Sequence, residues 1–289
     1  MKNTLTVENV YFSYGKKQIL NNVSFTATNG IIALLGNNGA GKTTLMNILT
    51  GLKSTKHGKV TLNDSNLLDT KQYPIQSVGY LPQNFDIYNN VTGYDFLSYV
   101  YDLKKIKESN KKKYILKIVD KFNLESVIHQ KVGKYSGGYK RRLGIAQAVL
   151  GQPPLIIIDE PTVGLDPEQR IEFRSLLSEI SRDSITLIST HIIEDVELFS
   201  DKILVLKDKC ISFNGSVEEM ISLSSPEINV TETSRELLSQ LSKKVTIIEE
   251  KRLNNDLVKV KFIKSDEVKG NNMNKEITLE NAYVYLQKK

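Results

Sequence analysis

The sequence of 289 residues predicts an α/β fold, and three patterns support this prediction. The run Ile31–Leu35 is continuously apolar, as expected of a strand buried on both faces of a sheet. From Leu155 to Leu206, apolar runs of strand length alternate with helical stretches, which indicates parallel strands. Between Thr92 and Leu150, apolar residues recur at steps of three and four, which indicates a helical insertion in this frame.

The remaining elements can be placed in chain order. Alternating residues in Leu5–Phe12 and Ile19–Phe25, with a turn between them, predict two antiparallel strands. A helix is expected over Thr43–Leu49, ended by Gly51. Further strands are expected at Lys59–Leu62, Val78–Leu81, Leu155–Ile158, Ile185–Ser189 and Ile203–Leu206, and further helices at Glu168–Arg182 and Ile192–Phe199.

The pattern breaks around Ser224-Ser225-Pro226, which suggests two domains. Residues 1–224 form the large domain, with its helical part at about 84–150, and residues 225–289 form a small α+β appendage. In the appendage we expect a helix at Arg235–Leu241 and strands at Val245–Ile248 and Leu257–Ile263. The composition of the appendage does not indicate what it does.

Charge and composition exclude several classes of protein. The net charge is +6, but the one dense basic stretch, Lys104–Lys117, is explained by a solvated helical face and has no interleaved aromatic residues, so no nucleic-acid partner is expected. A single cysteine, Cys210, excludes a disulfide framework and suggests a reducing compartment. No apolar run approaches the roughly 18–20 residues that cross a bilayer, and no signal segment is visible.

A glycine-rich turn follows the first buried strand and matches the pattern G-x-x-x-x-G-K-[ST]. Its glycines let backbone N–H groups turn inward around an anion, and the helix N-terminus adds positive potential. Lys42 can reach the β- and γ-phosphates of a nucleotide, and the Thr43 hydroxyl can bind Mg²⁺. The predicted nucleotide-binding residues of this turn are Gly36, Asn37, Asn38, Gly39, Ala40, Gly41, Lys42, Thr43 and Thr44.

Two carboxylates follow the buried strand at Leu155–Ile158. Ligands of open α/β sheets bind at the carboxyl ends of the strands, so Asp159 is placed to hold Mg²⁺, directly or through water. Glu160 is placed to orient and deprotonate an attacking water. The alternative is an exposed acidic turn, which the neighbouring phosphate-binding loop disfavours.

The segment Tyr135–Arg142 resembles the signature motif of ABC-type ATPases. The other motifs of that family are also present within residues 4–224, and all of them occur in the family's order. They are Tyr14 at the adenine-stacking position, Gln83 at the Q-loop position, Gly164-Leu165-Asp166 at the D-loop position and His191 at the switch position.

This resemblance implies a P-loop NTPase core with a RecA-like α/β subdomain, an antiparallel β subdomain and a helical insertion. It also implies that ATP and Mg²⁺ bind between the phosphate loop of one subunit and the signature helix of a second, head-to-tail subunit. Ser136, Gly137 and Gly138 would then approach the γ-phosphate, with Asp166 nearby. The implied catalytic residues are Lys42, Gln83, Glu160 and His191, and the implied metal-binding residues are Thr43, Gln83 and Asp159.

Two residues depart from the family pattern. Tyr135 replaces the usual leucine and Tyr139 the usual glutamine, and the effect of both on the nucleotide contacts stays open. The basic run Lys140–Arg142 is predicted to be a solvated helix face.

Within the family, the segments Gly144–Ala148, Pro161–Glu168 and Leu279–Leu286 resemble the branch that exports drugs, antibiotic peptides and lipids, including ATPases that export amphipathic peptides such as the phenol-soluble modulins. This implies a separate transmembrane permease subunit, a place at the cytoplasmic face of the membrane, and a homodimer or a heterodimer with a second ATPase. An importer ATPase and a soluble ABC protein acting on ribosomes or DNA are the alternatives. A GTPase is disfavoured, because no Asn-Lys-x-Asp motif is present.

Overall fold

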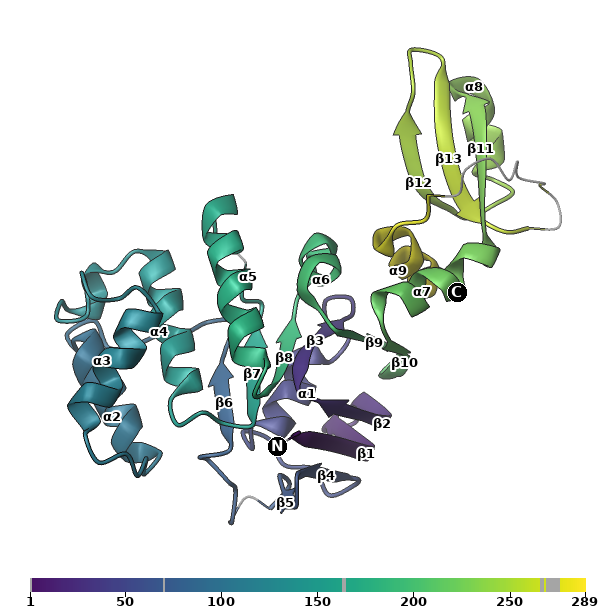
Figure 1. The fold of residues 1–289 in the computed structure, drawn as a ribbon. Helices are drawn as coiled ribbons and strands as arrows, with labels where there is room; N and C mark the ends of the chain where they lie inside the picture. Colours follow the sequence, from purple (N-terminus) through teal and green to yellow (C-terminus); the bar gives the residue numbers. More distant parts are fainter. Residues whose placement is uncertain (1, 70, 163–164, 266–267, 269–275) are drawn as a thin grey trace. The chain divides into compact units, whose positions relative to one another are not determined.

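The computed structural model describes residues 2–69, 71–162, 165–265, 268 and 276–289 (Figure 1). The chain divides into two compact units, residues 1–214 and 215–289. The sequence patterns place the domain boundary ten residues later, after residue 224, because they do not reveal that the helix at Val217–Ser224 packs with the C-terminal helix.

The N-terminal unit contains an antiparallel sheet with the strand order β2-β1-β4-β5. It is built from β1 (Thr4–Tyr14), β2 (Lys17–Thr28), β4 (Lys59–Leu62) and β5 (Ser65–Asn66). In β1, alternate residues such as Leu5 and Val7 are buried, as the alternating pattern predicted. The antiparallel pairing of β1 with β2 confirms that prediction.

A second sheet has the strand order β10-β9-β3-β8-β7-β6 and carries the phosphate loop. Neighbours are parallel in the pairs β3/β8, β3/β9, β7/β8 and β6/β7. The strands of the second sheet are β3 (Gly30–Leu35), β6 (Val78–Leu81), β7 (Leu155–Asp159), β8 (Ile185–Ser189), β9 (Lys202–Lys207) and β10 (Cys210–Gly215). Of these, only β10 was not predicted.

Both faces of this sheet are covered, which explains the continuous apolar runs. One core cluster combines Ile32 and Ile157 with residues of α1 (Lys42–Leu49) and of the antiparallel sheet. The other combines Ile31 and Ile156 with residues of α5 (Pro167–Ser181) and of the helical insertion. Adjacent strand residues therefore point into different cores, as the pleat requires. A short helix, α6 (Ile193–Phe199), follows β8.

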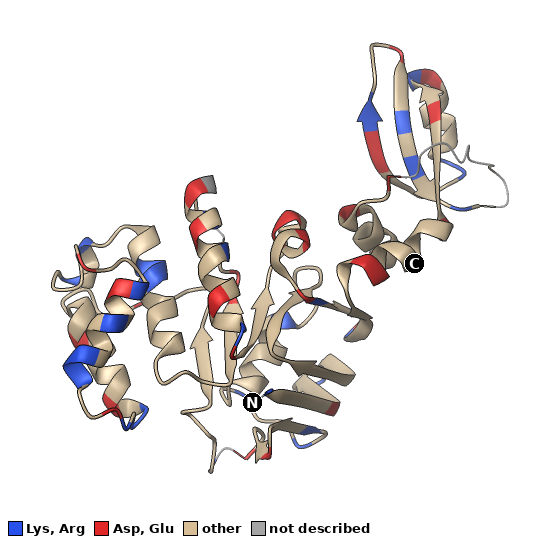
Figure 2. Ribbon diagram, in the orientation of Figure 1, with Lys and Arg blue, Asp and Glu red and all other residues tan. Residues whose placement is uncertain are grey.

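The helical insertion contains α2 (Gly93–Leu103), α3 (Lys111–Lys121), the 3₁₀ turn η1 (Val132–Lys134) and α4 (Gly137–Val149). Side chains of Thr92, Asn110 and Ser136 cap the three α-helices at their N-termini. Most lysines of the predicted basic stretch are exposed, and Figure 2 shows blue segments along α3, which carries Lys111–Lys113 and Lys117.

Lys104, the first residue of that basic stretch, is an exception. It is 6% exposed, and its ammonium donates to the carbonyl oxygens of Leu150 at 2.9 Å and Ala148 at 3.2 Å. These carbonyls end α4, where cations are favourable. Burial lowers the pKa of Lys104 to about 8. The prediction of a solvated face is therefore wrong for this residue.

The C-terminal unit is a three-stranded antiparallel sheet with helices, in the strand order β11-β13-β12. The predicted helix at Arg235–Leu241 (α8) and strand at Leu257–Ile263 (β13) are confirmed. The predicted strand at Val245–Ile248 lies instead at Ile247–Arg252 (β12). The other elements of the C-terminal unit are α7 (Val217–Ser224), η2 (Ser225–Glu227), β11 (Ile228–Ser234) and α9 (Leu279–Lys288).

A partly buried ion pair and an asparagine join β12, β13 and α9 in this unit. Lys261 is 5% exposed, and its ammonium lies 2.9 Å from the Glu249 carboxylate and 2.8 Å from the amide oxygen of Asn281. It also donates to the carbonyl of Glu276 at 2.7 Å. The Asn281 amide nitrogen donates to Glu249, so each charged group of the network has several partners.

Candidate active site

The phosphate loop connects β3 to α1, and its positions require glycine for different structural reasons. Gly39 and Gly41 adopt φ values of +81° and +109°, which are strained for other residues. Gly36 has an ordinary φ, but a Cβ atom there would lie 2.5 Å from the carbonyl oxygen of Leu206. The conformation of the loop therefore depends on glycine at all three positions.

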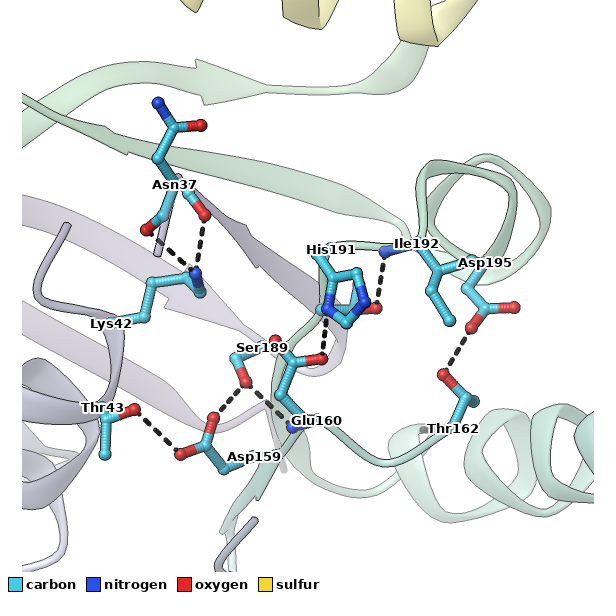
Figure 3. Close-up of polar contacts among 12 residues, drawn as sticks. Asn37, Lys42, Thr43, Asp159, Glu160, Thr162, Ser189, His191, Ile192 and Asp195 are labelled. Atoms are coloured by element: carbon cyan, nitrogen blue, oxygen red, sulfur yellow. Dashed lines mark hydrogen bonds and ion pairs between the residues drawn. The ribbon is translucent and has the colours of Figure 1, made fainter. Parts of the chain in front are cut away.

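Lys42 folds back over this loop. Its ammonium donates to the carbonyl of Gly36 at 2.6 Å and to that of Asn37 at 3.3 Å (Figure 3). The residue is 8% exposed, and burial lowers its pKa while Glu160 and Asp159 act in the opposite direction. The loop thus holds a cation beside inward-facing backbone groups, as a site for phosphate requires.

Asp159 ends β7 and is 2% exposed. One carboxylate oxygen accepts from the Thr43 hydroxyl at 3.1 Å, and the other accepts from the Ser189 hydroxyl (Figure 3). Thr43 and Asp159 offer paired oxygen ligands, which suit Mg²⁺. In the described ranges no cluster of three or more His, Cys, Asp or Glu residues could hold a metal, so these two oxygens would need water or phosphate to complete a magnesium site.

Glu160 has an unusual backbone conformation, with φ at +51°. Its amide donates to the carbonyl of Ser189 at 3.1 Å and lies 2.9 Å from the Ser189 hydroxyl. Its carboxylate shares a hydrogen bond of 2.8 Å with Nδ1 of His191 (Figure 3). Glu160 is buried and His191 exposed, so the pair reaches from the sheet edge toward solvent.

A second polar network links the segments that follow Glu160 and His191. The Thr162 hydroxyl donates to Asp195 on α6 at 2.6 Å, and Arg174 on α5 pairs with the same carboxylate, which is fully buried. The Thr190 hydroxyl accepts from the amide of Ile192 at 3.0 Å. The segment after Glu160 and the helix after His191 are therefore fixed to each other. No sequence pattern predicted this network.

Arg141 on α4 is the other functional candidate that the sequence patterns did not predict. Its guanidinium donates to the carbonyls of Pro161 at 3.0 Å, Asp159 at 3.1 Å and Gln83 at 3.4 Å, and also to that of Glu160. Burial lowers the pKa of Arg141, while Asp159 and Glu160 raise it. The half-buried guanidinium thus lies against the backbone of the acidic strand end.

The prediction of a solvated face over Lys140–Arg142 is therefore wrong at Arg141. The two neighbours of Arg141 make no hydrogen bond to the end of β7 in the described part of the chain. Lys140 is half-buried, and Arg142 forms an ion pair with Glu172, whose side chain is more than half exposed. The Arg142 guanidinium also lies 5.7 Å from the centroid of the Tyr139 ring. Only the middle residue of the run is directed toward the sheet edge.

The signature segment lies at the N-terminus of α4. Ser136 caps the helix by accepting from the amide of Tyr139 at 3.4 Å, and a Cβ atom added at Gly137 would meet no described atom within 4 Å. The unusual Tyr135 is buried, and its hydroxyl donates to the carbonyl of Val127 at 2.7 Å. The ring of Tyr139 packs against that of Tyr135 with centroids 6.2 Å apart. Both tyrosines thus contribute to packing in the helical insertion.

The remaining predicted residues are less closely connected to the sheet edge. The Gln83 side chain is exposed and forms no hydrogen bond with the parts of the chain that the structure describes. The Tyr14 ring is half exposed, and the Lys53 ammonium lies 4.9 Å from its centroid. Asp166 caps α5 by accepting from the amide of Gln169 at 2.9 Å. Val163 and Gly164, which belong to the predicted D-loop and export-branch segments, lie outside the described residues.

Comparison with known proteins identifies the family. Residues 20–163 match the family described as ABC transporter. The chain is 36% identical over 217 residues to the uncharacterized ABC transporter ATP-binding protein YxlF of Bacillus subtilis, which covers 75% of this chain and 72% of YxlF. It is 36% identical over 199 residues to the lantibiotic transport ATP-binding protein SrtF of Streptococcus pyogenes, covering 68% and 84% of the two chains. It is 31% identical over 204 residues to the linearmycin resistance ATP-binding protein LnrL of Bacillus subtilis, covering 70% and 66%.

Solved structures agree with this assignment. An ATP-binding subunit of an ABC transporter superposes with a TM-score of 0.69 at 26% identity, covering 76% of this chain and 92% of that one. A dimeric ATP-binding cassette in a post-hydrolysis state with ADP and Pi has the same fold, with a TM-score of 0.66 at 23% identity over 73% and 98% of the chains. The predicted P-loop core with its helical insertion is thereby confirmed. The chain belongs to the ATP-binding proteins of ABC transporters and is an ATPase.

Proposed function

We propose that two copies of this ATPase, or one copy and a second ATPase, bind ATP between the phosphate loop of one subunit and the Ser136 tip of the other. One observation carries this proposal. Lys42, Asp159 and Glu160 gather at the sheet edge, whereas Ser136 begins a helix in the insertion and shares no hydrogen bond with the phosphate loop in the described part of the chain. Each chain thus carries two half-sites, and a head-to-tail pair would complete both.

In this site, each residue at the sheet edge would have a separate role in hydrolysis. Lys42 would leave the carbonyls of its own loop to bind the β- and γ-phosphates. Thr43 and Asp159, whose oxygens already lie within hydrogen-bond distance of each other, would hold Mg²⁺, which neutralises phosphate charge when bound.

Glu160 would accept a proton from the attacking water, and His191, which is hydrogen-bonded to it, would hold the carboxylate in place and reach the γ-phosphate. Gln83 lies two residues beyond β6, next to the end of β7, and would close over this water and the metal. The exposed Tyr14 ring would stack on adenine, and the backbone amides at Gly137 and Gly138 would bind the phosphate from the opposite side.

We also propose that the ATPase drives export through a separate permease subunit. The names of SrtF and LnrL concern lantibiotic transport and linearmycin resistance, which supports an exporter of peptides or antibiotics. Amphipathic peptides such as phenol-soluble modulins are the narrowest substrate class that the sequence resemblance supports. None of the helices in the described ranges has the length and hydropathy of a membrane span. A permease partner would hold the chain at the cytoplasmic face of the membrane.

The variant Glu160→Gln tests the nucleotide site. It should bind ATP but lose turnover by about a hundredfold or more, because a carboxamide cannot accept the proton of water. With Mg-ATP it should accumulate as a dimer, measured by size-exclusion chromatography with light scattering. Glu194→Gln makes the same change of charge at an exposed position on α6 and should behave like the wild type. Normal turnover in Glu160→Gln, or no dimer with Mg-ATP either alone or with a second ATPase, would contradict the proposal.

A further inference from the structure

The signature helix α4 is joined to the catalytic end of the sheet of the same chain. The join is the Arg141 guanidinium, which donates to the carbonyls of Asp159, Glu160 and Pro161 on the strand end and of Gln83 on the neighbouring loop. Arginine suits this task, because its planar fork carries five N–H donors in a fixed arrangement. A lysine or glutamine could satisfy only some of these carbonyls.

These contacts matter because of the backbone at Glu160. Its left-handed φ of +51° is uncommon for a residue with a side chain and needs support from its surroundings. Ser189 fixes the amide of Glu160 from the β8 side, and Arg141 fixes its carbonyl from the α4 side. With both ends of the residue held, the carboxylate is directed toward His191.

We propose that Arg141 is a positioning residue for ATP hydrolysis, which orients Glu160 and makes the geometry of the catalytic end depend on the position of α4. In one respect this inference rests on the proposed function. In a head-to-tail pair, the Ser136 tip of α4 serves the nucleotide of the partner, so Arg141 would link one nucleotide site to the catalytic residues of the other.

Steady-state kinetics of three variants test the positioning role. In Arg141→Met, kcat should fall by about tenfold or more while KM changes by less than about threefold, because nucleotide contacts persist and Glu160 loses its orientation. Arg141→Lys retains the charge and part of the hydrogen bonding, so its kcat should be intermediate; it also decides the question if Arg141→Met does not fold. Lys140→Met, a neutralised neighbour on the same helix, is the control and should resemble the wild type.

Mixed dimers of differently tagged chains separate this role from general damage to α4. In a dimer with one Glu160→Gln chain, ATP is hydrolysed only at the site that contains the phosphate loop and Glu160 of the other chain. Arg141→Met in that other chain should lower turnover by about tenfold. The same change placed in the Glu160→Gln chain, whose α4 serves the working site, should alter turnover by less than about twofold.

Wild-type kcat in a folded Arg141→Met or Arg141→Lys variant would overturn the proposal. So would equal losses in the two mixed dimers, or a KM that rises as much as kcat falls, since these results assign Arg141 to the fold or to nucleotide binding. If Glu160→Gln fails to pair with Mg-ATP both alone and with a second ATPase, the proposed dimer fails, but the single-variant kinetics still decide whether Arg141 positions Glu160.

Discussion

Lys104 offers a test of how the signature helix is held in place. Its ammonium is buried against the last carbonyls of α4, at 2.9 Å from Leu150 and 3.2 Å from Ala148. Burial lowers its pKa from 10.5 to about 8. The native state therefore releases this proton at a lower pH than the unfolded chain does. Between these two pKa values the unfolded state binds more protons, so the free energy of unfolding must rise as the pH rises.

The size of this effect follows from the two pKa values. The charged form of buried Lys104 costs about 3 kcal/mol of stability well below pH 8, and this cost disappears as the pH approaches 10.5. Between pH 7 and pH 9 the free energy of unfolding should rise by about 1 kcal/mol. This pH range lies below the range in which tyrosines titrate. Burial raises the pKa of Tyr80 to about 12, so above pH 10 the ionisation of tyrosine in the unfolded chain would lower the free energy of unfolding.

Urea unfolding followed by far-ultraviolet circular dichroism measures this effect in the wild type and in Lys104→Met, at pH 7, 8 and 9. Methionine retains most of the length of the side chain but cannot titrate, so groups common to both proteins cancel in the comparison. The wild type should gain about 1 kcal/mol relative to the variant over this range. Lys105→Met alters the exposed neighbour and should gain stability with pH just as the wild type does. A difference between wild type and Lys104→Met that stays constant from pH 7 to pH 9 would refute the argument.

Three further predictions concern other parts of the chain. Gly36→Ala should weaken ATP binding by about tenfold or more, measured by calorimetry, because its Cβ would meet a carbonyl of β9, and Gly39→Ala should weaken it as well, because a φ of +81° is strained for alanine. Ser189→Ala should lower kcat by about tenfold with little change in KM, because both Asp159 and the amide of Glu160 lose a hydroxyl partner. Lys261→Met should lower the free energy of unfolding of the C-terminal unit by about 1–3 kcal/mol in urea titrations, and adding Glu249→Gln should restore part of it.

The sequence predicted the phosphate loop and the acidic strand end well, because both depend on local rules. The spacing of the glycines predicts a turn with positive φ values, which Gly39 and Gly41 adopt. The continuous apolar run predicts a strand covered on both faces, and this strand ends at Asp159. The parallel register of β7 and β8 places Asp159 beside Ser189, and the local patterns did not predict this pairing of residues 30 apart.

Arg141 and Lys104 were missed because neighbouring residues of the same charge concealed them. Helical periodicity would have identified both. Arg141 precedes the buried Ile145 by four residues, and Lys104 follows the buried Val100 by four, so each lies on the buried face of its helix. The contacts that satisfy their charges come from segments distant in the sequence, and no local pattern could have predicted those partners.

The network around Lys261 has a practical consequence for work with this protein. Asn281 contributes both an acceptor for the Lys261 ammonium and a donor for Glu249, and it comes from the last helix of the chain. Shortening the protein before that helix would remove the Asn281 amide from both charged groups of the pair, which leaves the Lys261 ammonium with Glu249 and the Glu276 carbonyl, and would uncover α7, which packs against α9. The residues of α9 should therefore be retained in expression vectors, and affinity tags placed at the other terminus.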